Sequence, residues 1–189
     1  MNLNIAVICG SVRPNRLSIL AVHYIIEAIK NDGHSPVLAD FTELQLPFVD
    51  TLETPGKLKK QYPYEAVQRW STIVDSADGF VFVSPEYNHS IPGVLKNAID
   101  WLSPEFTNKP AGLIGVSNGA IGGARMIEHL RAVMENFGTW SLKETVTFKS
   151  AQNVFDEQGK ILDETYAKQV AGLLSSLYKK AEVMKALRS

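Results

Sequence analysis

The sequence is poor in several features that define large classes of proteins. Its 189 residues include a single cysteine, Cys9, so no internal disulfide can form. It has 19 Lys and Arg against 20 Asp and Glu, and this balance lacks the basic excess of a general nucleic-acid-binding surface. No apolar run approaches the ~20 residues of a membrane-spanning helix, and residues 1–4 lack the basic start of a signal peptide. We therefore expect a cytoplasmic protein that binds neither nucleic acid nor membrane.

Motifs for nucleotide hydrolysis and metal binding are also missing. No GxxxxGK[ST] pattern is present, which excludes a P-loop NTPase. The histidines are scattered, and none has a cysteine or carboxylate partner at metal-ligand spacing, so we expect no metal site. No repeat, low-complexity tract or shift in composition marks a boundary. The sequence therefore predicts one domain over residues 1–189.

What is present is a regular alternation of strand and helix patterns. Nearly continuous apolar, β-branched runs predict five buried strands, at residues 3–9, 36–40, 79–84, 111–117 and 142–148. Apolar residues at helical spacing predict five helices, at residues 18–30, 64–76, 94–102 and 124–137 and after Asp163 as an N-cap. Residues 42–62 are expected to be irregular. This alternation indicates a doubly wound α/β domain with a parallel sheet covered on both faces, although periodicity leaves the strand order open.

Such folds bind ligands beyond the carboxyl ends of their strands, where this sequence has three unusual loops. The first, GSVRPNRLS, offers the hydroxyls of Ser11 and Ser18 and the forked donors of Arg13 and Arg16. It leads into a helix whose first N–H groups are free to bind an anion, which suits a phosphate monoester. The alternative is a polar loop with two solvated arginines and Ser18 as an ordinary helix cap.

The second loop, PEYNHSIPG, contains no lysine or arginine, so it is not a second phosphate site. Pro85 and Pro92 constrain the backbone at either end, and the amides and carbonyls between them could bind the edge of a planar heterocycle. Tyr87 could pack against such a ring. In the alternative interpretation Tyr87 only anchors the loop, and Glu86 and His89 are solvated.

The third loop, SNGAIGGAR, has glycines that would let the backbone approach a flat ligand closely. Their spacing does not form GxGxxG, so the Rossmann fingerprint for dinucleotides is absent. The alternative is a tight strand-to-helix turn that binds nothing.

The same region matches G-x-S-x-G at residues 115–119, the pattern of a hydrolase nucleophile. A triad of that kind needs an acid and then a histidine after Ser117. The only histidine there is His129, which falls on the very next helix. A serine hydrolase is therefore a disfavoured alternative.

The three loops together, and above all PEYN…PG.LKNAIDWL, resemble the NAD(P)H-dependent FMN reductase family, which includes quinone, azo-dye and chromate-type reductases. The resemblance runs from the first strand through the fourth helix. It implies a flavodoxin-like fold and a homodimer, or a pair of dimers, with FMN bound without a covalent link near the subunit interface.

The resemblance also implies roles for individual residues. The phosphate of FMN would be held by Ser11, Arg13, Arg16 and Ser18. The isoalloxazine would be lined by Pro85, Glu86, Tyr87 and Asn88. Its other edge would be closed by Ser117, Gly119, Gly122 and Gly123. Many family members lack the PNRL spacing of the first loop, which contains Arg16.

The expected activity follows from the cofactor. NADPH or NADH would pass a hydride to the flavin, which would then reduce a small acceptor such as a quinone, another flavin or an azo compound. No side-chain nucleophile is needed, so we predict no catalytic residue. The main alternative is a flavodoxin-type electron carrier without nicotinamide chemistry. Such carriers are usually strongly acidic, unlike this chain with its net charge of −1. We also expect residues 42–62 to cover the flavin of a neighbouring subunit.

Overall fold

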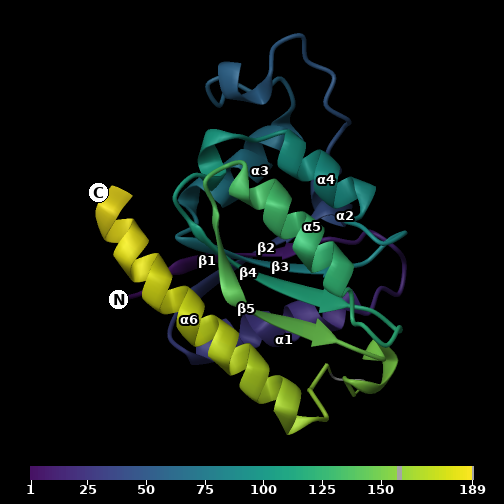
Figure 1. The fold of residues 1–189 in the computed structure, drawn as a ribbon. Helices are drawn as coiled ribbons and strands as arrows, with labels where there is room; N and C mark the ends of the chain where they lie inside the picture. Colours follow the sequence, from purple (N-terminus) through teal and green to yellow (C-terminus); the bar gives the residue numbers. More distant parts are fainter. Residues whose placement is uncertain (157–158, 189) are drawn as a thin grey trace.

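A computed structural model describes residues 1–156 and 159–188 of the chain, and one parallel sheet forms its centre (Figure 1). The strands are β1 (Asn4–Cys9), β2 (Ser35–Asp40), β3 (Gly79–Pro85), β4 (Pro110–Val116) and β5 (Trp140–Phe148). Their order in the sheet is β2-β1-β3-β4-β5, and every neighbouring pair is parallel. The expected parallel sheet is confirmed. Its topological switch point lies between β1 and β3, from which the chain builds outward in both directions.

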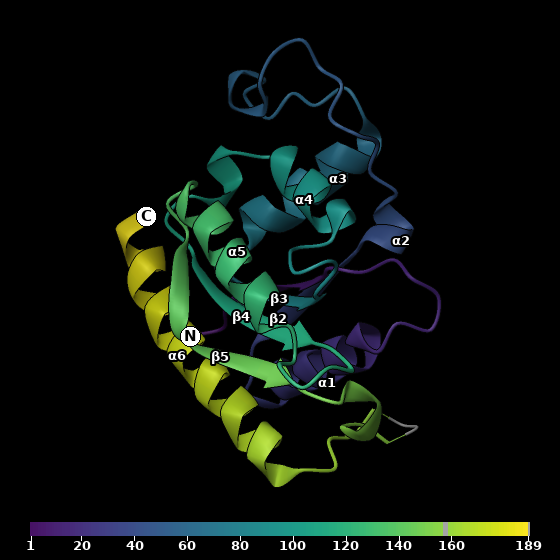
Figure 2. The ribbon, with the colours of Figure 1, turned by 45° about the vertical axis from the view of Figure 1, so that its right-hand side comes forward.

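Helices cover both faces of this sheet, as predicted. The long helices are α1 (Ser18–Asn31), α3 (Glu65–Ser76), α4 (Gly93–Asp100), α5 (Ala124–Glu135) and α6 (Glu164–Arg188). Apolar residues of α1 and α6 form one core with the sheet, and those of α3, α4 and α5 form the other (Figure 2). Asp163 caps α6 as expected, because its Oδ1 accepts a bond of 2.8 Å from the backbone N–H of Thr165. Among the described helices, none has the length and apolar character needed to cross a membrane.

The segment expected to be irregular contains two short helical elements, α2 (Phe41–Leu44) and the 3-10 turn η1 (Pro55–Lys57). Asp40 caps α2 by accepting a bond of 3.0 Å from the backbone N–H of Thr42. Four residues are too few to show helical periodicity, which is why the sequence pattern did not reveal α2. Two further 3-10 turns, η2 (Pro104–Phe106) and η3 (Ala151–Asn153), lie in other loops.

The chain between α2 and α3 projects from the body of the molecule (Figures 1 and 2). Its base is fixed by α4, where the side-chain N–H groups of Asn97 and Trp101 donate to the Pro47 carbonyl at 2.8 and 2.7 Å. Farther out, Phe48 is 82% exposed and Leu52 is fully exposed. The motif LKNAIDWL thus supplies the anchor for a protruding segment with exposed apolar side chains.

A buried carboxylate joins the beginning of the sheet to the end of α6. Asp78, immediately before β3, accepts from the backbone N–H of Asn4 at 2.9 Å and from Lys185 Nζ at 2.8 Å. Arg188 forms an ion pair with the same carboxylate at 3.5 Å. The amino ends of β1 and β3 are therefore held by residues more than 100 positions later in the chain.

Candidate functional site

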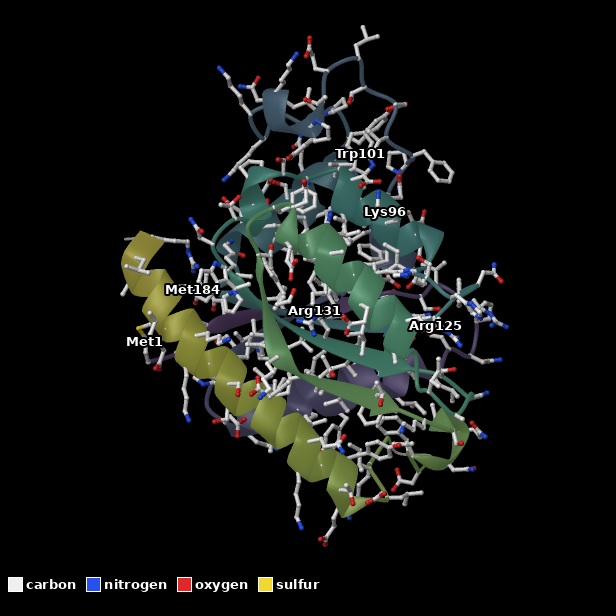
Figure 3. The ribbon with its side chains drawn as sticks, in the orientation of Figure 1. Met1, Lys96, Trp101, Arg125, Arg131 and Met184 are labelled. Carbon is white, nitrogen blue, oxygen red and sulfur yellow. The ribbon has the colours of Figure 1, made fainter. Side chains whose placement is uncertain are left out.

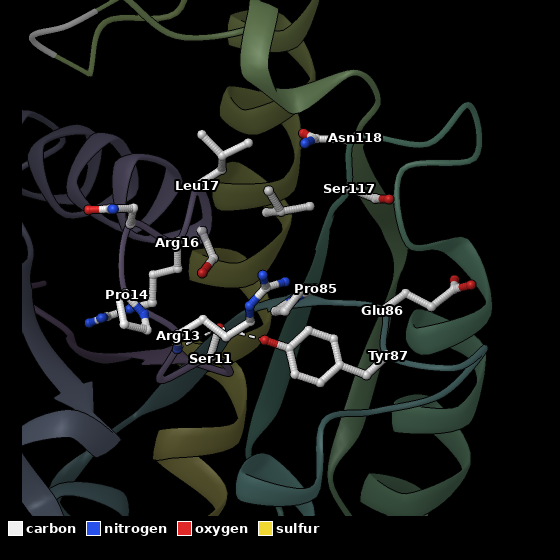
Figure 4. Close-up of a pocket in the computed structure, with 13 residues that line it drawn as sticks. Ser11, Arg13, Pro14, Arg16, Leu17, Pro85, Glu86, Tyr87, Ser117 and Asn118 are labelled. Carbon is white, nitrogen blue, oxygen red and sulfur yellow. Dashed lines mark hydrogen bonds between the residues drawn. The ribbon is translucent and has the colours of Figure 1, made fainter.

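A cavity of about 330 Å³ opens at the carboxyl ends of β1, β3 and β4. Its walls are formed by Ser11 and by residues 13–18, 85–87 and 116–118 (Figure 4). The three loops singled out in the sequence therefore converge on one place, beside the switch point where doubly wound sheets bind their ligands.

Most of the residues expected at the site lie in these walls. The cavity is lined by Ser11, Arg13, Arg16, Ser18, Pro85, Glu86, Tyr87 and Ser117. The expected residues outside its lining are Asn88, Gly119, Gly122 and Gly123. The lining also includes residues that sequence reasoning missed: Pro14, Asn15, Leu17, Val116 and Asn118. The missed residues are neighbours of recognised ones in the same loops, so the loops themselves were the usable signal.

One end of the cavity suits an anion. The start of α1 lies in the wall there, and Leu17, its N-cap residue, makes no side-chain capping bond. The positive end of the helix dipole therefore lies at the cavity, although the N–H groups of Ile19 and Leu20 already donate to the carbonyls of Arg16 and Leu17, at 3.2 and 3.1 Å. Ser11 and Ser18 are buried beside it, whereas Arg13 is exposed and extends toward the middle of the site (Figure 4).

The second arginine of this loop points the other way. Arg16 Nη2 donates to Asp40 Oδ2 at the end of β2, and the two side chains are only 14% and 9% exposed. The pair fastens the loop between β1 and α1 to the neighbouring strand. The expected contact of Arg16 with a phosphate stays a prediction, and its guanidinium already has a carboxylate partner.

The second loop is a tight hairpin. Tyr87 and Ser90 exchange two backbone hydrogen bonds of 3.0 Å, and the residues between them, Asn88 and His89, have φ of 49° and 68°. Positive φ at both central positions defines a type I′ turn, in which asparagine is favoured. Both side chains are exposed at the tip, outside the cavity. The backbone geometry of the turn thus accounts for an asparagine at position 88.

A side-chain contact links the first two loops across the cavity. The Tyr87 hydroxyl lies 3.1 Å from Ser11 Oγ (Figure 4). Because Ser11 is buried beside the start of α1, Tyr87 spans the cavity from the loop after β3 to the loop after β1.

Glu86 is held by the start of α5. Its Oε1 accepts from Arg125 Nη1 at 2.9 Å, and its Oε2 accepts from the Arg125 backbone N–H at 3.1 Å. Partial burial opposes ionisation, but the bonds from Arg125 and from the Met126 backbone outweigh it, so the pKa of Glu86 is lowered. Glu86 is therefore ionised at neutral pH and is no proton donor.

The third loop uses its glycines for close packing. Gly122 and Gly123 have φ of 61° and 83°, and both lie against Gly115 of β4. A Cβ on Gly115 would lie 2.3 Å from the Gly122 carbonyl oxygen. This packing folds the loop back onto β4 and leaves Ser117 in the cavity wall.

The site does not have the geometry of a hydrolase. Ser117 Oγ accepts a bond of 3.0 Å from the backbone N–H of Gly119. His129, the histidine that a triad would need, pairs with Ser90 instead, at 2.9 Å from Nδ1 to Oγ. The hydrolase alternative is therefore rejected.

Within residues 1–156 and 159–188, no group of His, Cys, Asp and Glu is placed to hold a metal ion.

Comparison with known proteins gives a consistent result. Residues 3–153 match the family described as NADPH-dependent FMN reductase. The chain is 44% identical over 117 residues to an NAD(P)H-dependent FMN reductase of Pseudomonas aeruginosa, in an alignment covering 59% of this chain and 63% of that protein. It is 31% identical over 183 residues to an NAD(P)H:quinone oxidoreductase of Solanum tuberosum, covering 93% of this chain and 91% of that one.

Solved structures agree with the fold. The flavoenzyme NAD(P)H:(acceptor) oxidoreductase FerB of Paracoccus denitrificans superposes with a TM-score of 0.80 at 25% identity, over 96% of this chain and 98% of that one. The flavodoxin-like fold is confirmed. Because the family match covers most of the sequence, including all three loops of the cavity, this chain belongs to the NADPH-dependent FMN reductase family.

Proposed function

We propose that this chain is an NAD(P)H-dependent oxidoreductase that holds FMN in the cavity and passes its electrons to quinones and similar flat acceptors. Family membership supports the flavin and the nicotinamide, and the activity named for the Solanum tuberosum relative supports the quinone. One observation carries the assignment: the loops after β1, β3 and β4 meet around a single cavity, which Arg13 lines from the first loop and Pro85 and Tyr87 line from the second.

The anion-binding end fits the phosphate of FMN. The start of α1 and the hydroxyls of Ser11 and Ser18 lie there, and the guanidinium of Arg13 extends from the same loop toward the middle of the cavity. Each charge-assisted hydrogen bond to a phosphate contributes about 1.5–3 kcal/mol, so this donor set is sufficient for retention. Arg16, bonded to Asp40, would support the loop that carries these donors.

The other walls fit a planar ring system. Pro85 and Tyr87 form one side, and residues 116–118 form another. The tight hairpin after Pro85 and the glycine packing behind Ser117 keep both walls close to the sheet. A site framed in this way binds a heterocycle through backbone groups and apolar contact.

When bound, FMN supplies the redox chemistry, because it takes a hydride from NAD(P)H and returns two electrons to an acceptor. The chain's own residues would bind the phosphate and frame the ring. They would leave the mouth of the cavity open to the two substrates in turn. Glu86, ionised and held by Arg125, orders the wall of the site and moves no proton. His89 is exposed at the hairpin tip and does not line the cavity.

Visible spectroscopy tests the assignment directly. The purified protein should show flavin absorbance, or acquire it from added FMN, and the colour should bleach with NADPH or NADH without oxygen. Addition of a quinone should then restore it. A protein that takes up no FMN would contradict the proposal. FMN that binds but is not reduced by either nicotinamide would indicate an electron carrier instead.

We further propose that the active form is a homodimer, or a pair of dimers, in which residues 42–62 of one subunit cover the flavin of another. The projection of this segment and the exposure of Phe48 and Leu52 support the proposal. Deleting the tip of the segment should weaken both dimerisation and turnover, and a variant with both unchanged would rule it out. A cytoplasmic location stays a prediction of the sequence.

A further inference from the structure

The hairpin that forms one wall of the cavity is attached to α5 at two points. At one point the Glu86 carboxylate accepts from the backbone N–H and the guanidinium of Arg125, at 3.1 and 2.9 Å. At the other, Ser90 Oγ lies 2.9 Å from His129 Nδ1. Arg125 and His129 are four residues apart, on one side of the helix. Glu86 and Ser90 bracket the turn, so α5 holds the hairpin on both sides.

These contacts lie on the outer side of the wall. The Glu86 side chain points away from the middle of the cavity and is only 10% exposed (Figure 4). Residues 85–87 line the cavity, and the Tyr87 hydroxyl reaches Ser11 across the site. Arg125 does not line the cavity. Its position at the start of α5 is visible in Figure 3. A displacement of the hairpin by loss of its outer contacts would therefore move the inner wall.

We propose that Arg125 and His129 are positioning residues for the flavin site, which act through Glu86 and Ser90. This inference rests on the proposed function. By holding the hairpin against α5, they set the distance between the ring-binding wall and the anion-binding loop. A site arranged in advance binds more tightly, because less ordering is needed when the ligand arrives. Of the two residues, Arg125 has the larger effect, because its loss leaves the nearly buried carboxylate of Glu86 without its cation.

The test is titration of FMN into the flavin-free full-length protein. Arg125→Met should raise the dissociation constant of FMN by up to about tenfold, because part of the energy of the lost charged hydrogen bond is transmitted to the ligand through the hairpin. Arg125→Lys should recover part of the affinity. Glu86→Gln should weaken FMN binding to a similar extent. The double variant should bind FMN no more weakly than the single variant with the lower affinity, since both changes break the same contact. His129→Ala should have a smaller effect, because it removes a single exposed hydrogen bond.

Arg131→Met on the same helix is a matched control. Arg131 lies six residues after Arg125 on α5, and its Nη1 donates to the Leu142 carbonyl of β5 at 2.8 Å (Figure 3). This variant should lower the melting temperature but leave the affinity for FMN unchanged. At saturating FMN, the visible circular dichroism of the bound flavin should change in Arg125→Met and not in Arg131→Met. That signature separates positioning from a general loss of stability.

The outcomes are distinguishable. Unchanged FMN affinity in Arg125→Met, or an equal loss of affinity in Arg131→Met, would overturn the inference. Additive losses from Glu86→Gln and Arg125→Met would also overturn it, because they would show two independent roles. A wild-type protein that binds no FMN would refute the proposed function instead.

Discussion

Replacing Arg13 with methionine would separate phosphate binding from ring binding at the candidate site. Arg13 is exposed and extends toward the middle of the cavity, so its loss should leave the fold intact. A charge-assisted bond to a phosphate contributes about 1.5–3 kcal/mol, and the dissociation constant of FMN should therefore rise about 10- to 150-fold. Riboflavin has the same ring system without the phosphate, and its affinity should not change.

The assay is a parallel titration of the flavin-free protein with FMN and riboflavin, followed by the quenching of flavin fluorescence. Arg16→Met provides the contrast, because it leaves the nearly buried Asp40 without its cation. That variant should unfold at a lower temperature and bind both flavins less well. Equal weakening of FMN and riboflavin in Arg13→Met would refute the placement of the phosphate beside α1, and so would no weakening of either.

Three further changes test other parts of the structure. Gly115→Ala would place a Cβ 2.3 Å from the Gly122 carbonyl oxygen, so urea unfolding should show a loss of about 1–3 kcal/mol, and an unchanged midpoint would contradict the packing described for this loop. Burial lowers the pKa of Lys109 from 10.5 to about 8. Between pH 8 and pH 10.5 the unfolded chain binds a proton at Lys109 that the folded chain lacks. The free energy of unfolding of the wild type should therefore rise with pH relative to that of Lys109→Met, and parallel pH profiles of the two proteins would refute this. His89 has a φ of 68°, which glycine adopts without strain, so His89→Gly should raise the free energy of unfolding by up to about 1 kcal/mol. The affinity for FMN should not change, and a loss of affinity would place His89 in the site after all.

The sequence predicts most of the architecture because the three central strands, β1, β3 and β4, are buried on both faces. Apolar runs such as residues 79–84 are unmistakable, and all five predicted strands are present. The strand order was not predictable, since a buried strand has the same pattern whichever neighbours it pairs with. The helix α2 was missed because a single capped turn carries no period.

The candidate site was predictable at the level of loops and less so at the level of side chains. Carboxyl ends of parallel strands share one edge, so the convergence of the three loops follows from the topology. Where a side chain points depends on partners that are distant in the sequence. Arg16 turns toward Asp40, 24 residues away, and Glu86 meets Arg125 after 39 residues. No local pattern predicts such pairs.

The carboxylate of Asp78 also bears on how the chain folds as it is made. Its cations are supplied by Lys185 and Arg188, which the ribosome adds more than 100 residues after Asp78 itself. A nascent chain can pair β1 with β3 well before that point, but the buried charge beside them then has only a backbone partner in Asn4. Since an uncompensated buried carboxylate opposes packing, stable closure of the sheet should wait until α6 is complete. The domain is therefore expected to reach its native state as one unit, late in synthesis.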